Sequence, residues 1–369
     1  MTGDNGGEKA SLPLVGGLFG TGEKKPEVVP ELPKNPKLAD IPEKTNVLYA
    51  TSWSASSKTK IDYFIDLAKN TDANALVIDI KDYSGLLAYK TDNPDLSKYI
   101  SVEEKIKDPA GLVKRLHDNG IYAIARVTVF QDPALALKRP DLAVKNTKTG
   151  KTWLDNKELA WVDPASKEVW QYNLAIAKDA FSKGFDEVNF DYIRFPSDGD
   201  LTIMSYPFYD AAAKTKSESI KEFFMYLREN LKDEKISADL FGLTVTASGD
   251  LGIGQVIEDA FGNFDYICPM VYPSHFATGF MGYKNPAAYP YEVVKHSMEE
   301  AERKIAAWKV VNPDENPGKI RPWLQDFDLG ADYGVPEVKG QIKATVETVN
   351  SGWMIWSPKN IYTREALVN

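Results

Sequence analysis

The sequence has few cysteines and histidines, the residues that form disulfides, most zinc sites and His-based catalytic triads. Cys268 is the single cysteine among 369 residues, so no disulfide can form within the chain. The three histidines are His117, His275 and His296, and no Cys/His cluster has the spacing of zinc ligands. We therefore predict no metal site and no cofactor, and we expect acid–base chemistry to depend on carboxylates.

Long apolar runs and excess positive charge are also missing. No apolar stretch is long enough to span a bilayer, so we predict no transmembrane segment. The formal net charge of −9 argues against a nucleic-acid partner, because such proteins usually carry a basic stripe. It argues equally against docking on anionic lipid.

The first 44 residues differ in composition from the rest of the chain. Residues 11–20 are weakly apolar and follow no charged segment, so we do not expect them to form a signal peptide. Residues 23–42 are rich in Pro, Glu, Lys and Val, which is typical of a semi-rigid linker. We predict a flexible segment over 1–44 and one folded domain over 45–369. A tether before a folded domain suits an extracellular or cell-surface protein whose signal has been removed; the alternative is the disordered N-terminus of a cytoplasmic protein.

After residue 45, short apolar runs alternate with amphipathic helical stretches, which indicates βα units and a parallel sheet. Eight strands are expected, at 47–51, 75–80, 121–129, 185–191, 236–241, 264–271, 320–325 and 353–356. The helices expected between and after them lie at 58–70, 109–119, 166–182, 217–231, 253–261, 290–308, 336–350 and 362–367. An open doubly wound sheet would show the same alternation. The count of eight and the lack of a Gly-rich phosphate loop favour a (β/α)8 TIM barrel.

Polar side chains gather at the exits of these strands, where barrel enzymes place their active sites. Charged groups there cost free energy unless they are paired or used, so several on one face indicate a site. The predicted catalytic carboxylates are Asp191, Asp239 and Asp326. The residues predicted to bind substrate are Asp79, Lys81, Asp82, Arg126, Arg194, Tyr272, His275, Trp323, Gln325 and Trp356.

Asp191 is the strongest single candidate. Successive strand residues point to opposite sides, so Asn189 and Asp191 share one side of their strand while Val188 and Phe190 face the surrounding helices. Asp191 is therefore expected to point inward at the exit of the fourth strand.

Glycoside hydrolysis usually requires a second carboxyl group about 5 to 10 Å from the first. Asp239 on the neighbouring strand and Asp326 across the barrel mouth are equal candidates for the proton donor. The alternative role for Asp191 is a structural ion pair with Arg194 or Arg126.

Four strings of residues resemble those of a bacterial family of glycosyl-hydrolase-like barrels, first described as a domain of unknown function. They are Asp-Ile-Lys-Asp at 79–82, Phe-Asp-Tyr-Ile-Arg-Phe-Pro at 190–196, Pro-Met-Val-Tyr-Pro-Ser-His-Phe at 269–276 and Pro-Trp-Leu-Gln-Asp at 322–326. The likeness covers about residues 47 to 356, and the string around Asp191 is the most specific. The resemblance implies the barrel fold and a carbohydrate substrate; it does not bring an agreed acid–base pair.

One departure is informative. Chitinase-like barrels carry an Asp-x-x-Asp-x-Asp-x-Glu run on the fourth strand, with the Glu as general acid. Here Asp186 and Asp191 match its first and third acids, but Asn189 replaces the second and Ile193 replaces the Glu. Another carboxyl must supply the proton if this barrel hydrolyses sugars.

We therefore expect a glycoside hydrolase that acts on an extracellular or cell-wall polysaccharide. The alternative is a non-catalytic carbohydrate-binding barrel on a surface or cell wall. Two nearby carboxyl groups, one with a raised pKa, would favour the enzyme.

Overall fold

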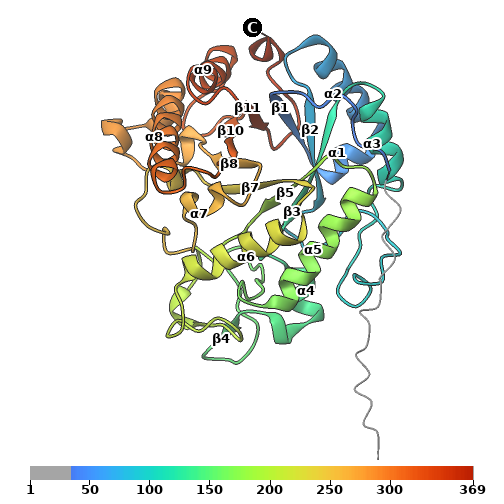
Figure 1. The fold of residues 1–369 in the computed structure, drawn as a ribbon, viewed down its shortest axis with the longest axis vertical. Coiled ribbons are helices and arrows are strands. Elements are labelled where there is room, and N and C mark those ends of the chain that lie inside the picture. Colours follow the sequence, from blue (N-terminus) through green and yellow to red (C-terminus); the bar gives the residue numbers. More distant parts are fainter. Residues whose placement is uncertain (1–34, 369) are drawn as a thin grey trace, which may run out of the picture. The chain divides into compact units, whose positions relative to one another are not determined.

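The computed structural model describes residues 35–368, which form a closed barrel of eight parallel strands surrounded by helices (Figure 1). The ring runs β1–β2–β3–β5–β7–β8, continues from β8 to β9 and β10, and returns through β11 to β1. This confirms the predicted (β/α)8 barrel. Most of the flexible segment predicted for 1–44 lies outside the described residues.

The strands follow the predicted positions closely. Those of the barrel are β1 (Thr45–Ala50), β2 (Ala75–Lys81), β3 (Tyr122–Thr128), β5 (Glu187–Asp191), β7 (Lys235–Phe241), β8 (Tyr266–Met270), β9 (Lys319–Ile320), β10 (Trp323–Gln325) and β11 (Gly352–Trp356). Outside the barrel, β4 (Lys145–Asn146) and β6 (Met204–Ser205) form a small antiparallel pair.

The helices lie around the barrel. They are α1 (Ser52–Ser56), α2 (Lys58–Asn70), α3 (Pro109–His117), α4 (Pro133–Lys138), α5 (Lys167–Ser182), α6 (Lys216–Asn230), α7 (Ile257–Phe261), α8 (Pro290–Val311) and α9 (Val335–Val346). Side-chain caps fix several starts, as where Asp108 accepts from Gly111 N–H and Thr215 forms a capping box with Glu218. None of the helices between residues 35 and 368 has the length and apolar character needed to cross a membrane.

Several predicted elements differ from the structure. The helix expected at 336–350 ends at Val346, and the one expected at 362–367 is a 3-10 helix over Arg364–Leu367. The seventh strand is split into β9 and β10, because Pro322 has no N–H to donate to a neighbouring strand. Helix α7 begins at Ile257 rather than at residue 253. Gly252 and Gly254 adopt φ values of 72° and 84°, which an α-helix cannot accommodate.

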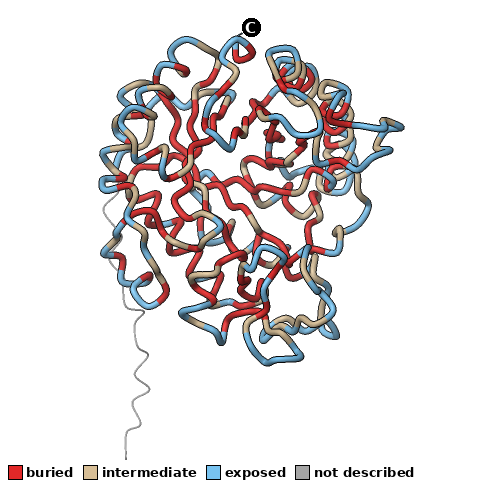
Figure 2. Tube along the Cα trace, turned by 180° about the vertical axis from the view of Figure 1, so that it is seen from behind, coloured by how far each residue is buried: buried red, intermediate tan, exposed pale blue. Residues whose placement is uncertain are grey.

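Buried side chains fill both faces of the barrel wall, and Figure 2 shows the buried residues following the strands while the exposed ones lie on the periphery. Outward residues such as Val188 and Phe190 pack on the helices, as the alternation predicted. A separate apolar cluster that includes Val47, Val77 and Ile124 fills the barrel interior.

A buried ion pair lies inside the barrel, near the N-terminal ends of its strands. Glu187 and Arg321 are both 0% exposed, and Arg321 contacts the two carboxylate oxygens of Glu187 through both terminal nitrogens. Arg321 also donates to Thr45 Oγ1 at 2.7 Å and lies 4.1 Å from the ring centroid of Tyr266. Because Glu187 begins β5 and Arg321 follows β9, the pair joins strands three positions apart in the ring.

Residues 35–38 contact the N-terminal end of the barrel. Asn35 N–H donates to the Ser182 carbonyl at 3.1 Å, and Leu38 N–H donates to Asp186 Oδ1 at 2.7 Å. Leu38 also packs against the interior cluster. The packed domain therefore begins ahead of residue 45, although these four residues were assigned to the flexible segment.

Candidate active site

A cleft of about 910 Å³ opens at the C-terminal ends of the barrel strands. Ten of the thirteen residues predicted to form the site line it: Asp79, Asp82, Arg126, Asp191, Arg194, Asp239, Tyr272, His275, Trp323 and Trp356. The other three, Lys81, Gln325 and Asp326, lie outside its lining.

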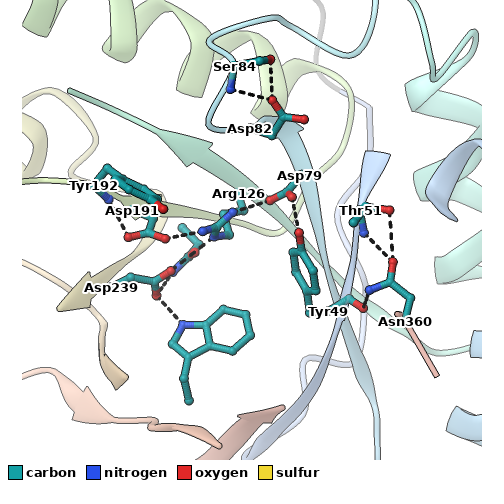
Figure 3. Close-up of polar contacts among 12 residues, drawn as sticks. Tyr49, Thr51, Asp79, Asp82, Ser84, Arg126, Asp191, Tyr192, Asp239 and Asn360 are labelled. Atoms are coloured by element: carbon teal, nitrogen blue, oxygen red, sulfur yellow. Dashed lines mark hydrogen bonds and ion pairs between the residues drawn. The ribbon is translucent and has the colours of Figure 1, made fainter. Parts of the chain in front are cut away.

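Arg126, on β3, lies at the centre of the floor (Figure 3). Its Nη1 donates to Asp79 Oδ1 at 2.6 Å, and its Nη2 contacts Asp191 Oδ2. Its Nε lies 3.5 Å from Asp239 Oδ2. One guanidinium thus contacts three carboxyl groups from β2, β5 and β7.

The neighbouring carboxylates stabilise the positive charge of Arg126. Burial alone would lower its pKa, but the carboxylates of Asp79 and Asp191 outweigh burial and raise the pKa well above its ordinary value. Asp79 is itself held by Tyr49, whose hydroxyl donates to Asp79 Oδ2 at 2.5 Å. Burial raises the pKa of Asp79, while Arg126 and Tyr49 oppose that rise.

Asp191 ends β5 and points inward, as the alternation predicted. Its Oδ2 is paired with Arg126, and its Oδ1 accepts from Tyr192 N–H at 2.5 Å. Tyr192 has a φ of 53°, in the left-handed region that residues other than Gly rarely adopt. Such strained positions cluster at functional sites, and this one fixes the turn that presents Asp191. The ion pair with Arg126, which the sequence raised as an alternative, is therefore present.

Asp239, on the neighbouring strand β7, has a different environment. Its Oδ1 accepts from Trp323 Nε1 at 2.7 Å and from Asn189 Nδ2 at 2.8 Å. Its Oδ2 has no hydrogen-bond donor among the described residues. Burial, followed by the negative charge of Asp191, raises the pKa of Asp239 to about 7. Near neutral pH this carboxyl group holds a proton for much of the time.

The family model described as "Putative glycosyl hydrolase domain" matches residues 47–362 of this sequence. The chain belongs to this family. No curated protein sequence matches the chain significantly.

Solved structures of similar fold include several glycoside hydrolases. The PgaB (BpsB) glycoside hydrolase domain from Bordetella bronchiseptica is 14% identical, with a TM-score of 0.60 over 89% of this chain and 99% of its own. The α-galactosidase TtGalA from Thermus thermophilus is 13% identical, with a TM-score of 0.52 over 90% of this chain and 65% of its own. At these identities the likeness concerns the fold.

A hypothetical protein from Ruminiclostridium thermocellum ATCC 27405 is more similar in sequence. It is 41% identical and covers 52% of this chain and 96% of its own, with a TM-score of 0.48.

One wall of the cleft is aromatic. Tyr272 packs tilted against Trp356 at 5.4 Å and against His275 at 5.2 Å between ring centroids. Burial, with the charges of Asp239 and Asp191, raises the pKa of Tyr272, so its hydroxyl keeps its proton. This wall can offer both a flat apolar surface and hydrogen bonds to a sugar.

His275 is oriented by residues behind the wall. Ser274 Oγ donates to Gln325 Oε1 at 2.8 Å and lies 3.1 Å from His275 Nδ1. Because the hydroxyl has one proton to give, it accepts from Nδ1–H, and Nε2 of neutral His275 is left as an acceptor. Burial lowers the pKa of His275, which favours this neutral form. Gln325 does not line the cleft, so it acts here as a support for His275 and not as a substrate contact.

Lys81 is the clearest correction to the predicted site. The register between β2 and β3 shifts between Asp79 and Lys81, so the two side chains do not share a face. Lys81 is fully buried on the outer side of the barrel wall, where its Nζ lies 2.6 Å from Asp132 Oδ2 and 3.1 Å from Asn173 Oδ1. It neutralises Asp132 rather than Asp79 or Asp82.

Two other predicted residues have their main contacts within the protein. Asp82 accepts from Ser84 N–H at 2.9 Å and remains on the cleft rim. The Arg194 guanidinium packs against the rings of Trp161 and Phe241, at 4.8 and 4.7 Å, and burial lowers its pKa.

Asp326 lies outside the cleft lining, contrary to the expectation that it faces Asp191 across the mouth. Both of its oxygens accept from Thr363, from the backbone N–H and from Oγ1, each at 2.8 Å. Burial raises the pKa of Asp326, and these two donors oppose the rise. Its contacts attach the C-terminal segment to the barrel.

An Asp326→Asn variant should therefore lose stability and keep its chemistry. Losing one of two buried acceptors is expected to lower the free energy of unfolding by about 1 to 3 kcal/mol, measured by urea denaturation. Its kcat/KM should stay within about twofold of wild type. A loss of more than a hundredfold in activity at unchanged stability would instead restore Asp326 as a candidate donor.

Tyr49 and Trp53 are among the lining residues that the sequence did not single out. Tyr49 lies on β1 two residues after Val47, so the same alternation that identified Asp191 would have pointed it inward. Trp53 lies just past the end of β1, at the cleft rim. Within residues 35–368, no group of His, Cys, Asp and Glu side chains is arranged to hold a metal ion.

Proposed function

We propose that the protein hydrolyses glycosidic bonds in a polysaccharide, with Asp191 and Asp239 as its working pair of carboxyl groups. Membership of the glycosyl hydrolase family supports the reaction class. The observation that carries the assignment is the contrast between neighbours: Asp191 is ion-paired with Arg126, whereas the pKa of Asp239 is raised to about 7. Neighbouring carboxyl groups in different environments are the usual basis of distinct acid–base roles in one site.

In this mechanism Asp191 acts as nucleophile or general base at the anomeric carbon. Arg126 and Tyr192 N–H orient its two oxygens. Asp239 supplies the proton to the leaving oxygen. Trp323 and Asn189 hold its Oδ1, so the proton is carried on Oδ2, which has no other donor to accept from among the described residues.

The proposal includes a movement of Arg126. Asp239 is only 1% exposed, and its Oδ2 faces Arg126 Nε at 3.5 Å. A general acid must come within hydrogen-bond reach of the oxygen it protonates. We infer that Arg126 turns towards Asp79 when a sugar enters, which uncovers Oδ2 of Asp239.

The location outside the cell is a part of the proposal that rests on residues 23–42, whose Pro-rich composition suits a tether. The test is protease treatment of intact cells that produce the natural protein. Degradation comparable to that of a known surface protein, with a cytoplasmic marker left intact, is the expected result. Protection equal to that of the cytoplasmic marker would contradict an external location.

A second candidate function is a carbohydrate-binding barrel without chemistry. The observation that favours it is the burial of the acidic residues: Asp79 and Asp191 are 4% exposed and Asp239 is 1% exposed, all around one arginine. That arrangement also describes a structural ion-pair network. A screen of polysaccharides for reducing-end release and for binding, with wild type and Asp191→Asn in parallel, separates the two: an enzyme cleaves and the variant only binds, whereas a binding module gives binding alone.

The rate of hydrolysis should fall as the pH rises through about 7. Asp239 must be protonated to act, and its folded pKa is raised to about 7, so kcat/KM should be level below that pH and fall about tenfold per unit above it. The measurement is a pH profile between 5 and 9 on a substrate with a poor leaving group. In Asp239→Asn this alkaline fall should disappear from the residual activity on activated aryl glycosides. A wild-type profile that is level from 6 to 9 would remove Asp239 as the donor.

The same pKa shift acts on stability. Folded Asp239 binds its proton more tightly than the unfolded chain does, so its contribution to stability is fullest below pH 4 and is lost as the pH rises to about 7. Asp239→Asn should remove this part of the pH dependence of unfolding.

A further inference from the structure

Trp53 is unusually exposed for a tryptophan of this protein. All eight tryptophans lie in the described part of the chain, and Trp53 is the only one with an exposed side chain, at 63%. Leaving a large aromatic ring in water forgoes the favourable free energy of its burial. Because Trp53 lines the cleft, its exposure marks a surface that a ligand can cover.

The backbone that carries Trp53 is held in place. Thr51 caps α1 by accepting from Ser54 N–H at 3.1 Å, and its own N–H donates to Asn360 Oδ1 at 2.9 Å (Figure 3). Asn360 Nδ2 in turn donates to the Tyr49 carbonyl at 3.2 Å. The ring is therefore presented by an anchored turn, which limits the conformational entropy lost when a ligand binds.

The ammonium group of Lys105 contacts the Trp53 ring. Lys105 Nζ lies 5.1 Å from the Trp53 ring centroid, within the range of a cation–π contact. The Lys105 side chain is 6% exposed, and its Nζ lies 3.0 Å from Glu103 and 3.5 Å from Asp82. The cation thus occupies one face of the ring and is tied to two acids, while the ring remains largely open to the cleft.

Trp53 and the end of β7 lie on opposite sides of the cleft. It follows β1, whereas Phe241 and Leu243 line the cleft at the end of β7. The closed ring places β1 and β7 four positions apart among eight, on opposite sides of the barrel. Asp191, at the end of β5, lies at an intermediate position. A ligand that touches both Trp53 and Asp191 must extend across the mouth.

We propose that the Trp53 ring is a stacking platform for a pyranose ring of a polysaccharide, at a subsite remote from Asp191. The C–H bonds on one face of a pyranose carry partial positive charge, which suits the negative face of an indole. A protein partner is disfavoured, because it needs roughly 800 Å² on each side, and the neighbours of Trp53 on the rim are the charged Lys105 and Glu103. The proposal deepens the proposed function, on which it rests, by making the substrate a chain rather than a single sugar.

The test is affinity electrophoresis in native gels cast with soluble polysaccharides: mixed-linkage β-glucan, xylan, galactomannan, pullulan, galactan and glycol chitin. Asp191→Asn serves as the parent, so that no gel is digested. We expect at least one polysaccharide to retard the parent, and Trp53→Ala in that background to weaken the apparent Kd at least tenfold. Trp53→Phe should weaken it less, because a smaller ring remains.

Phe208→Ala is the matched control, because Phe208 is an exposed aromatic, at 49%, that does not line the cleft. It should leave retardation unchanged. Circular dichroism and urea unfolding of the Trp53 variants show whether they fold as the parent does. The proposal is overturned if no polysaccharide retards the parent, or if folded Trp53→Ala is retarded as strongly as Phe208→Ala.

The result that refutes the proposed hydrolysis differs from the result that refutes the Trp53 platform. A wild type that binds a polysaccharide through Trp53 but releases no reducing ends keeps the platform and refutes the hydrolysis. A wild type that cleaves the polysaccharide while Trp53→Ala shows the same KM for it keeps the hydrolysis and refutes the platform.

Discussion

Asp191→Asn is expected to lower kcat by a factor of about 10² to 10⁴ or more while sugar binding persists. The side chain keeps its shape, so packing changes little, but the group that would attack or stabilise an oxocarbenium-like centre loses its charge. Arg126 retains Asp79 as a partner at 2.6 Å, so the floor of the cleft should hold together. The measurements are reducing-end release and affinity electrophoresis on the same polysaccharide.

Asp198→Asn is a suitable control, because Asp198 is an exposed carboxylate that also lines the cleft. It makes the same chemical change without touching Arg126. Equal rates for Asp191→Asn and Asp198→Asn would refute carboxylate catalysis at Asp191. Asp239→Asn adds the donor's signature: a large loss on substrates with poor leaving groups and a smaller loss on activated aryl glycosides, which need little protonation.

The second large effect is on stability. Arg321→Met should lower the free energy of unfolding by about 3 to 5 kcal/mol, because it leaves the Glu187 carboxylate buried without its partner. Urea denaturation followed by circular dichroism is the measurement. The Glu187–Arg321 pair lies near the N-terminal ends of the strands and does not line the cleft. The protein that remains folded should therefore keep its substrate preference.

The double variant Glu187→Gln/Arg321→Met tests the cause. Removing both charges avoids the unpaired buried carboxylate, so the double variant should be more stable than Arg321→Met alone. If the two unfold at the same urea concentration, loss of packing around Arg321 explains the effect and the uncompensated charge does not.

The fold followed from local patterns. Alternation of apolar runs and amphipathic stretches predicted eight strands, and the inward set on β5, Glu187, Asn189 and Asp191, follows from side-chain alternation alone. The same rule holds on β7, where Ser237 and Asp239 share the inner side and Asn189 Nδ2 donates to both. Where a strand is regular, one residue fixes the direction of the others.

The rest of the site depended on features that alternation does not encode. The irregularity after Asp79 turns Lys81 outward, and no residue type in the string Asp-Ile-Lys-Asp announces it. Asp326 follows the end of β10, where the chain direction is set by its contacts with Thr363 from a distant segment. The central place of Arg126 depends on three strands meeting at one point, which is a property of the closed barrel.

The packing of residues 35–38 has a practical consequence. These residues lie against the N-terminal end of the barrel, where Leu38 N–H donates to Asp186, while the cleft opens at the other end. A support coupled just ahead of Asn35 would therefore hold the protein at the N-terminal end of the barrel and leave the mouth facing the solution. Immobilisation through this point should preserve access for long chains, whereas coupling through lysines near the rim, such as Lys157, should obstruct it.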